Sequence, residues 1–277
     1  VTTPAVFGAA YYDLTDQLTV SVEGRYQWDK IEQTPLVAPP GVATTGVAAE
    51  TLSETFTSFS PRISVDYQIT DDTLIYGLFS RGFRPGGFNA ALKTSPPALV
   101  AALLSVVPTA SLAFEQEQLD NYEVGIKSTF LDGRARAILT FYKNDWIDGQ
   151  VGSTVALPGF TNLITITVNN GEAKLEGMEF EGQFQATRNL KLSGTFAYNK
   201  SELVSYGVGS SGNCADCNLV YGRFGGAIGN RLPTTPKTSA GEVLATGGID
   251  ELGRYPRIRE VAVLFRNGMP DDVAKKV

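Results

Sequence analysis

Two arginines in a glycine-rich stretch are the first residues whose type and spacing suggest binding chemistry. Arg81 and Arg84 stand three positions apart, shortly before Phe88 and Asn89. A guanidinium carries a permanent charge with five donors, and glycine lets a ligand approach the backbone closely. These four residues are therefore candidates for binding an anionic ligand. The alternative, which we favour for the arginines, is that they shape the end of a strand and pair with nearby carboxylates.

Cys214 and Cys217 form a C-x-x-C pair, a spacing that can serve redox or metal chemistry. The chain has only these two cysteines and no histidine, so the usual zinc ligand set cannot be completed. The pair lies in a long connection that we expect to be extracellular, where oxidising conditions favour a disulfide. We predict a disulfide that staples this loop, and no metal site.

Composition removes several other classes of function. The absence of histidine excludes nucleophile–histidine hydrolases, and we expect no catalytic residue and no cofactor. A net charge of −6 argues against a nucleic-acid partner. Charged residues such as Glu23, Arg25, Lys127, Glu179 and Glu181 resemble a catalytic cluster, but their spacing along strands indicates a charge-paired wall.

The elements that carry these residues are indicated by alternation with a period of two. From Leu18 to Trp28 every even position is apolar or glycine, and every odd position is polar. Side chains at alternate positions of a strand face opposite sides of a sheet. The same pattern predicts nine strands in all: 5–12, 18–31, 54–69, 73–83, 118–131, 135–151, 163–185 (with an irregularity near 169–173), 190–205 and 236–245.

Connections of two kinds alternate between these strands. Short polar turns are predicted at 13–16, 70–72, 131–134 and 187–189, whereas the stretches 33–51, 84–114, 149–162 and 207–232 are long and are predicted to be irregular. Outer-membrane barrels have short periplasmic turns and long extracellular loops. No run of 18 apolar residues offers a spanning helix. We therefore predict an all-β, antiparallel transmembrane β-barrel, present here in part as an open sheet.

Aromatic residues on the apolar sides of these strands suit a membrane interface. Tyr26, Trp28, Tyr142 and Trp146 are expected to point outward, where amphipathic rings form girdles between lipid and water. Ordinary enrichment of aromatic residues in strands is the simpler alternative. We favour the girdle.

Several segments resemble TonB-dependent outer-membrane receptors of the ferric-siderophore type. They are SRGFRPGGFN (80–89), NYEVGIKS (121–128), FYKNDW (141–146), VNNGEAKLEGME (168–179) and RLPTTPK (231–237). The resemblance implies a 22-stranded barrel in the bacterial outer membrane, plugged by an N-terminal domain. It also implies lipid, a ferric siderophore or similar chelate, and TonB acting through the plug region as partners.

The sequence departs from that family pattern in ways that suggest a C-terminal barrel fragment. We expect about nine or ten of the 22 strands, with neither plug, TonB-contacting segment, signal peptide nor closing aromatic strand. Residues 1–246 form the expected partial barrel. From residue 247 the alternation fades and charge density rises, so 247–277 is interpreted as an atypical tail from a frameshift or fusion, although 260–266 could still pair as a strand.

Three hypotheses for function follow. The first is a fragment of a TonB-energised receptor for a ferric-siderophore-like ligand. The second is a porin-like channel without energy coupling, and the third is a soluble all-β binding module. The third requires that a second sheet cover Leu18, Val20 and Val22, whereas the first two require an exposed apolar band.

Overall fold

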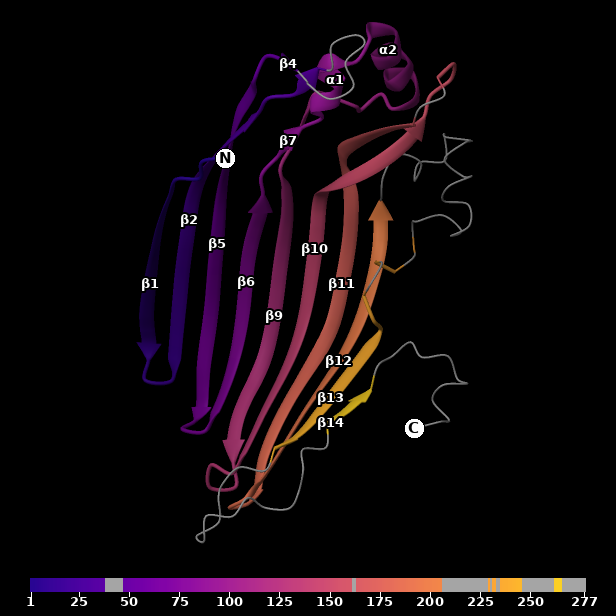
Figure 1. Ribbon diagram of the computed structural model, residues 1–277. Helices are drawn as coiled ribbons and strands as arrows, with labels where there is room; N and C mark the ends of the chain where they lie inside the picture. The colour runs from indigo at the N-terminus through magenta and orange to yellow at the C-terminus, as the bar shows by residue number, and fades with distance from the viewer. Residues whose placement is uncertain are drawn as a thin grey trace, which may run out of the picture.

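Ten strands form one continuous antiparallel sheet in the computed structural model, which describes residues 1–37, 47–160, 163–205, 229, 231–232, 235–245 and 262–265 (Figure 1). Each strand pairs with the next along the chain, and the sheet is open at both edges. The strands are β1 (Ala5–Thr15), β2 (Leu18–Gln33), β5 (Leu52–Thr70), β6 (Thr73–Arg84), β9 (Glu117–Phe130), β10 (Ala135–Ala156), β11 (Leu163–Thr187), β12 (Leu190–Ser205), β13 (Thr238–Ala245) and β14 (Ala262–Phe265).

All nine predicted strands are present, and the predicted partial antiparallel barrel sheet is confirmed. The tenth strand, β14, lies within the tail and pairs with β13 through Ala262–Phe265. The pairing covers only these four residues of the tail. The domain boundary at residue 246 therefore stays a prediction.

Short turns gather at one end of the sheet and long connections at the other (Figure 1). Two of the long connections are more ordered than predicted. The stretch 84–114 is not irregular, because it contains two helices and a small two-stranded sheet. Similarly, 149–162 continues the β10–β11 hairpin as far as Ala156 before β11 starts at Leu163. The added elements are α1 (Ala90–Thr94), α2 (Pro97–Val106), β7 (Gly87–Phe88) and β8 (Ala113–Phe114), with β3 (Leu36–Val37) and β4 (Val47–Ala48) in the first long connection.

The register sorts side chains onto two faces of the sheet. The apolar face carries residues such as Val22, Ile63, Val124 and Phe141, which stand on neighbouring strands with the same orientation. Val22 is 50% exposed and Val124 51% exposed, so no second sheet covers them within the described chain. Of the three residues that the soluble-module hypothesis requires to be covered, Val22 is exposed, while Leu18 and Val20 are half-buried. The exposure of Val22 counts against that hypothesis. In the described part of the chain, no helix is long and apolar enough to cross a membrane.

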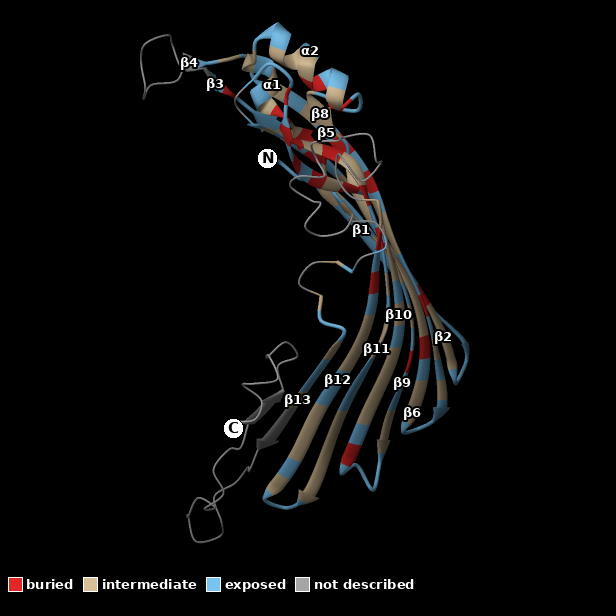
Figure 2. Cartoon of the chain, turned by 90° about the vertical axis from the view of Figure 1, so that its right-hand side faces the viewer, coloured by how far each residue is buried: buried red, intermediate tan, exposed pale blue. Residues whose placement is uncertain are grey.

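The buried core lies at the long-loop end instead of between two layers (Figure 2). Leu103 and Val107 of the α2 segment pack against Val155 on β10 and Ile166 and Val168 on β11. All five side chains are almost fully buried. Burial of apolar surface thus attaches the helices to the extended hairpin.

Candidate functional site

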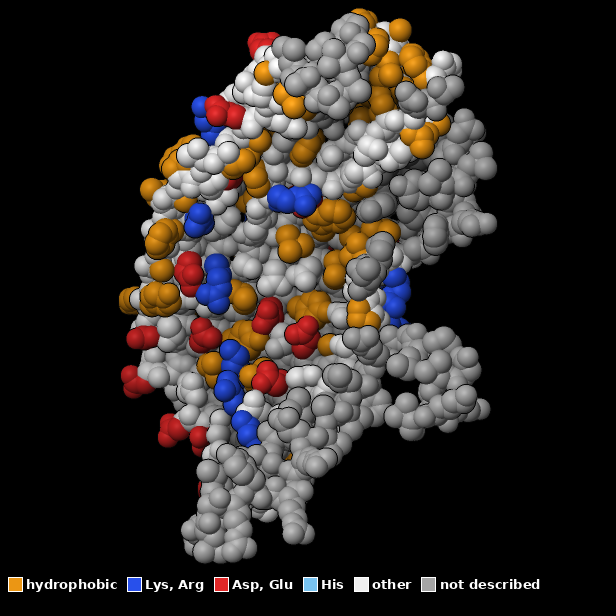
Figure 3. Space-filling view, viewed as in Figure 1, with side chains coloured by type: hydrophobic (Ala, Val, Ile, Leu, Met, Phe, Trp, Pro, Cys, Tyr) orange, Lys and Arg blue, Asp and Glu red, His pale blue; other side chains and the backbone are white. Residues whose placement is uncertain are grey.

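The face opposite the apolar one carries polar and charged side chains. Figure 3 shows acidic and basic side chains gathered over the lower halves of its strands. Glu23 and Arg62 form an ion pair of 2.7 Å. The Tyr76 hydroxyl donates to Glu123, and the Lys127 ammonium lies 4.6 Å from the Tyr76 ring centroid. In a barrel this face lines the interior. Of the five residues predicted to form a charge-paired wall, only Glu23 is in an ion pair within the described part of the chain, because Arg25 donates to the neutral Gln27 and Lys127 lies over the Tyr76 ring.

The two candidate arginines lie on opposite faces of β6. Arg81 shares the apolar side with Phe79, whose ring centroid is 6.0 Å from its guanidinium, and forms two hydrogen bonds of 2.6 and 2.8 Å with Asp120. Asp120 is buried, and the two parallel bonds from Arg81 hold its carboxylate in a bidentate arrangement. Arg84 stands on the polar face opposite Glu117. The two arginines therefore do not form one pocket.

Arg84 is the candidate that stays accessible at the loop end of the polar face. Its Nε lies 3.0 Å from Glu117 Oε1, yet its side chain remains 58% exposed. Glu117 also accepts a 2.7 Å bond from the backbone N–H of Gln150. The carboxylate thus fixes the guanidinium in place while leaving some of its five donors free.

Asn89 is engaged in hydrogen bonds within the protein through its side-chain amide and has a structural role. Its side-chain amide donates to the carbonyls of Ser111 and Thr167 over 2.9 Å each, and its Oδ1 accepts from Thr167 N–H over 2.7 Å. These bonds join the helical connection to β11. Phe88 lies beside it in β7 and is half-buried.

Lys93 of α1 links the helices to the chain before β5. Its ammonium donates to Glu50 Oε2 over 2.8 Å. This hydrogen bond and the charge of Lys93 lower the pKa of the Glu50 carboxyl. Both side chains are solvent-exposed, so the pair contributes little to stability.

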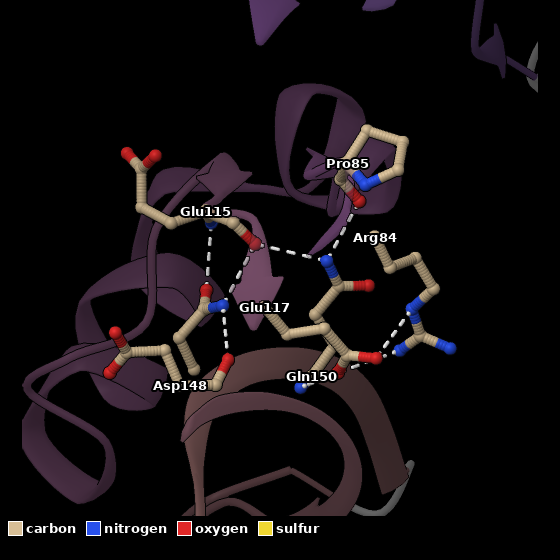
Figure 4. Close-up of polar contacts among 7 residues, drawn as sticks. Arg84, Pro85, Glu115, Glu117, Asp148 and Gln150 are labelled. Carbon is tan, nitrogen blue, oxygen red and sulfur yellow. Dashed lines mark hydrogen bonds and ion pairs between the residues drawn. The ribbon is translucent and has the colours of Figure 1, made fainter. Parts of the chain in front are cut away.

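A cluster of polar contacts ties the helical connection to the bend of the β10–β11 hairpin (Figure 4). Asn169 donates to the carbonyls of Glu115 and Asp148, and its Oδ1 accepts from Glu115 N–H over 2.7 Å. Gln150 donates to the carbonyls of Pro85 and Glu115. Two amide side chains therefore join three backbone segments, and Arg84 borders this junction.

Asp148 forms the bend itself, with a left-handed φ of 51° where the β10–β11 register shifts. Only its carbonyl takes part in the cluster contacts. We expect Asp148→Gly to leave stability unchanged or slightly higher, because glycine adopts positive φ without strain. Asp148→Val should destabilise the hairpin by about 1–2 kcal/mol. Thermal unfolding of the two variants tests this; equal melting temperatures would contradict it.

Tyr142 and Trp146 are not on the face expected for them. Tyr142 stands opposite Glu123 and Gly177, and Trp146 packs over Gly149, so both belong to the polar face. The expectation that they point outward is wrong. Tyr26 and Trp28 do share the apolar face, with ring centroids 4.7 Å apart, and their place at a membrane interface stays a prediction.

Cys214 and Cys217 lie outside the described residues, so the disulfide stays a prediction. Among the residues that are described, no group of three or more aspartate, glutamate, cysteine or histidine side chains is arranged to hold a metal ion. In the described part of the chain, the polar face thus offers the exposed Arg84 guanidinium at its loop end and no such metal-binding group.

This two-faced sheet with long loops at one end matches a family model described as "TonB dependent receptor-like, beta-barrel" over residues 1–264. The chain belongs to that family. It is therefore a segment of an outer-membrane receptor barrel and not an enzyme. Its position in the bacterial outer membrane explains why the apolar face can stay uncovered by protein.

Individual relatives of this TonB-dependent receptor barrel are distant. The metal-pseudopaline receptor CntO of Pseudomonas aeruginosa is 27% identical over 184 residues, which are 65% of this chain and 20% of that protein. The siderophore receptor PiuA of Acinetobacter baumannii has 18% identity and a TM-score of 0.62, covering 88% of this chain and 31% of its own. The ferric yersiniabactin receptor FyuA of Yersinia pestis has 19% identity and a TM-score of 0.58, covering 87% and 30%. The chain thus spans a fifth to a third of the length of these proteins.

Proposed function

We propose that the chain forms part of the wall and mouth of a TonB-energised receptor that imports a metal held by a small anionic chelator. A ferric siderophore is the expected cargo. The names of the relatives support a metal cargo, since they include a metal-pseudopaline receptor, a ferric yersiniabactin receptor and a copper transporter. TonB and outer-membrane lipid are the partners that this function requires.

The accessible guanidinium of Arg84 is the observation that carries the proposal. It projects from the polar face, where a ligand entering past the long loops first meets the strands. Glu117 holds it in one orientation, and so less entropy is lost when a carboxylate or catecholate oxygen binds. The exposed Arg25, on β2 of the same face, adds a second cation.

Replacing Arg84 with glutamine should weaken binding of an anionic ferric chelate about tenfold, because a charge-assisted hydrogen bond contributes roughly 1.5–3 kcal/mol. Binding of a radiolabelled ferric siderophore to outer membranes bearing the full-length gene product measures this. The fold should persist, because Glu117 keeps its bond from Gln150 N–H.

Arg134→Gln is the matched control, since it removes the same charge from a turn at the opposite end of the sheet. Its affinity should equal that of the unaltered protein. Equal affinities for Arg84→Gln and Arg134→Gln would contradict the role of Arg84. A loss in both would mean that net charge, and not position, governs binding.

Energy coupling separates the receptor from a porin-like channel. Dissipating the proton gradient of intact cells should abolish uptake while surface binding of the chelate persists. Uptake that continues at the same rate and does not saturate with ligand concentration would support the channel instead.

A further inference from the structure

The apolar face changes chemistry abruptly near the long-loop end of three neighbouring strands. Residues that stand opposite one another across strands form a rung of the sheet. The rung Phe141–Met178–Tyr198 is apolar, and the next two rungs toward the loops are entirely charged. We call their six residues the charge grid: Lys143, Glu176 and Lys200 in the first rung, and Asp145, Lys174 and Glu202 in the second.

Signs alternate in both directions across the charge grid. Lys143 stands opposite Glu176, which stands opposite Lys200, and the following rung has the reverse order of signs. Opposite charges facing each other across strands stabilise a register, whereas like charges destabilise it. This order of signs favours the observed pairing of β10, β11 and β12, because it places no like charges opposite one another.

The charge grid is nonetheless mostly unpaired. Lys143 and Asp145 form an ion pair of 2.9 Å. The other four side chains are exposed and form no ion pair with any described residue. Lys174 and Lys200 therefore offer two free ammonium groups, and Glu176 and Glu202 two free carboxylates, on the side that faces the membrane.

The tilt of barrel strands places these charges at a membrane boundary and not within hydrocarbon. One rung runs from Val22 on β2, across six strand spacings, to Lys200 on β12. On β2 the apolar face stays uncharged for eight more residues, until Lys30. At a tilt of about 40°, eight strand residues rise about 20 Å along the membrane normal, and six strand spacings climb about 18 Å. Lys30 and Lys200 therefore lie at nearly the same height.

A charged surface at this height meets the headgroups of the leaflet on the side of α1 and α2. Lysine at a membrane boundary is attracted to anionic lipid, by about 1 kcal/mol per residue near the surface. A divalent cation can join a phosphate group to a carboxylate, since Ca²⁺ and Mg²⁺ take oxygen ligands from both. Alternating lysines and glutamates therefore complement both the phosphate groups and the divalent cations of a headgroup layer.

We propose that the charge grid is a docking surface for phosphorylated lipid headgroups of the outer leaflet. Lys174 and Lys200 bind phosphate oxygens, and Glu176 and Glu202 bind the divalent cations that bridge neighbouring phosphates. The inference goes beyond ligand import, since it concerns the outside of the barrel and does not depend on the cargo.

The double variant Lys174→Ala/Lys200→Ala tests the proposal. Full-length gene product is purified, delipidated and incubated with bisphosphorylated lipid A, with Mg²⁺ present, and the retained lipid is measured by native mass spectrometry. We expect the double variant to bind lipid A about thirtyfold more weakly than the unaltered protein, because two lysines are lost. EDTA should lower retention by the unaltered protein, and dephosphorylated lipid A should bind weakly to both.

Lys127→Ala/Lys191→Ala is the matched control, because it removes two ammonium groups from the polar face. It should retain as much lipid as the unaltered protein. Equal retention by both double variants, or equal binding of phosphorylated and dephosphorylated lipid, would overturn the proposal. So would a dimer that only Lys174→Ala/Lys200→Ala disrupts, since a second copy would then occupy the grid.

Discussion

Replacing Leu139 with arginine should nearly abolish the folded protein in the outer membrane. Leu139 lies on the apolar face between Ile126 and Phe180, one rung below Phe141. An arginine at the membrane midplane of a barrel costs about 2–4 kcal/mol, which falls to about 0–1 kcal/mol near an interface. The guanidinium also lacks a carboxylate there, because its cross-strand neighbours are apolar.

The neighbouring residue provides a stringent control. Ile138 points to the polar face between Lys127 and Glu181, so Ile138→Arg introduces the same group one position away and beside a carboxylate. We expect near-normal amounts of this variant. The amount of folded protein in outer-membrane fractions, judged by its heat-modifiable electrophoretic mobility, measures both. Similar losses would show that the faces are assigned wrongly.

Replacing Asn89 with alanine should release the helical connection from the hairpin. The change leaves Thr167 N–H, Thr167 C=O and Ser111 C=O without their partner. A buried polar group that loses its hydrogen bond costs about 1–3 kcal/mol. Allowing for partial hydration, a local loss of about 3 kcal/mol corresponds to roughly a hundredfold less protection of α1 and α2 amides from hydrogen exchange.

The sheet should keep its protection in Asn89→Ala, because the strands do not depend on this side chain. Asn189→Ala is the control, since Asn189 is an exposed residue in the β11–β12 turn. Hydrogen exchange of the purified proteins should show no change there. Unaltered protection of α1 and α2 in Asn89→Ala would mean that apolar packing of Leu103 alone holds the helices.

Strand positions were predictable because one face of each strand meets lipid and the other does not. This requirement produces strict alternation, as in Leu18–Trp28, and it is visible without any partner strand. The alternation also shows which face of the sheet each residue occupies, because odd and even positions of a strand lie on opposite faces. Arg81 and Arg84 are an odd number of positions apart, so their placement on opposite faces of β6 could have been deduced from the sequence.

Where aromatic residues stand at both odd and even positions of a strand, the sequence alone could not show which of them faces lipid. Phe141 and Tyr142 are adjacent, and either could face lipid until pairing with Val124 and Glu123 decides the matter. The helices were missed for another reason. Ala98–Val107 is apolar on every side, without helical periodicity, and the core that orders it lies on residues some 50 positions later.

The junction in Figure 4 has a consequence for how this receptor can diversify or be redesigned. Asn169 and Gln150 belong to the hairpin, but most of the groups they bind, the carbonyls of Pro85 and Glu115 and the N–H of Glu115, belong to the segment between β6 and β9. Neither loop carries a complete set of partners. Grafting one of them from a relative therefore leaves donors and acceptors unmatched, and only exchange of both loops as a pair transfers a new recognition surface intact.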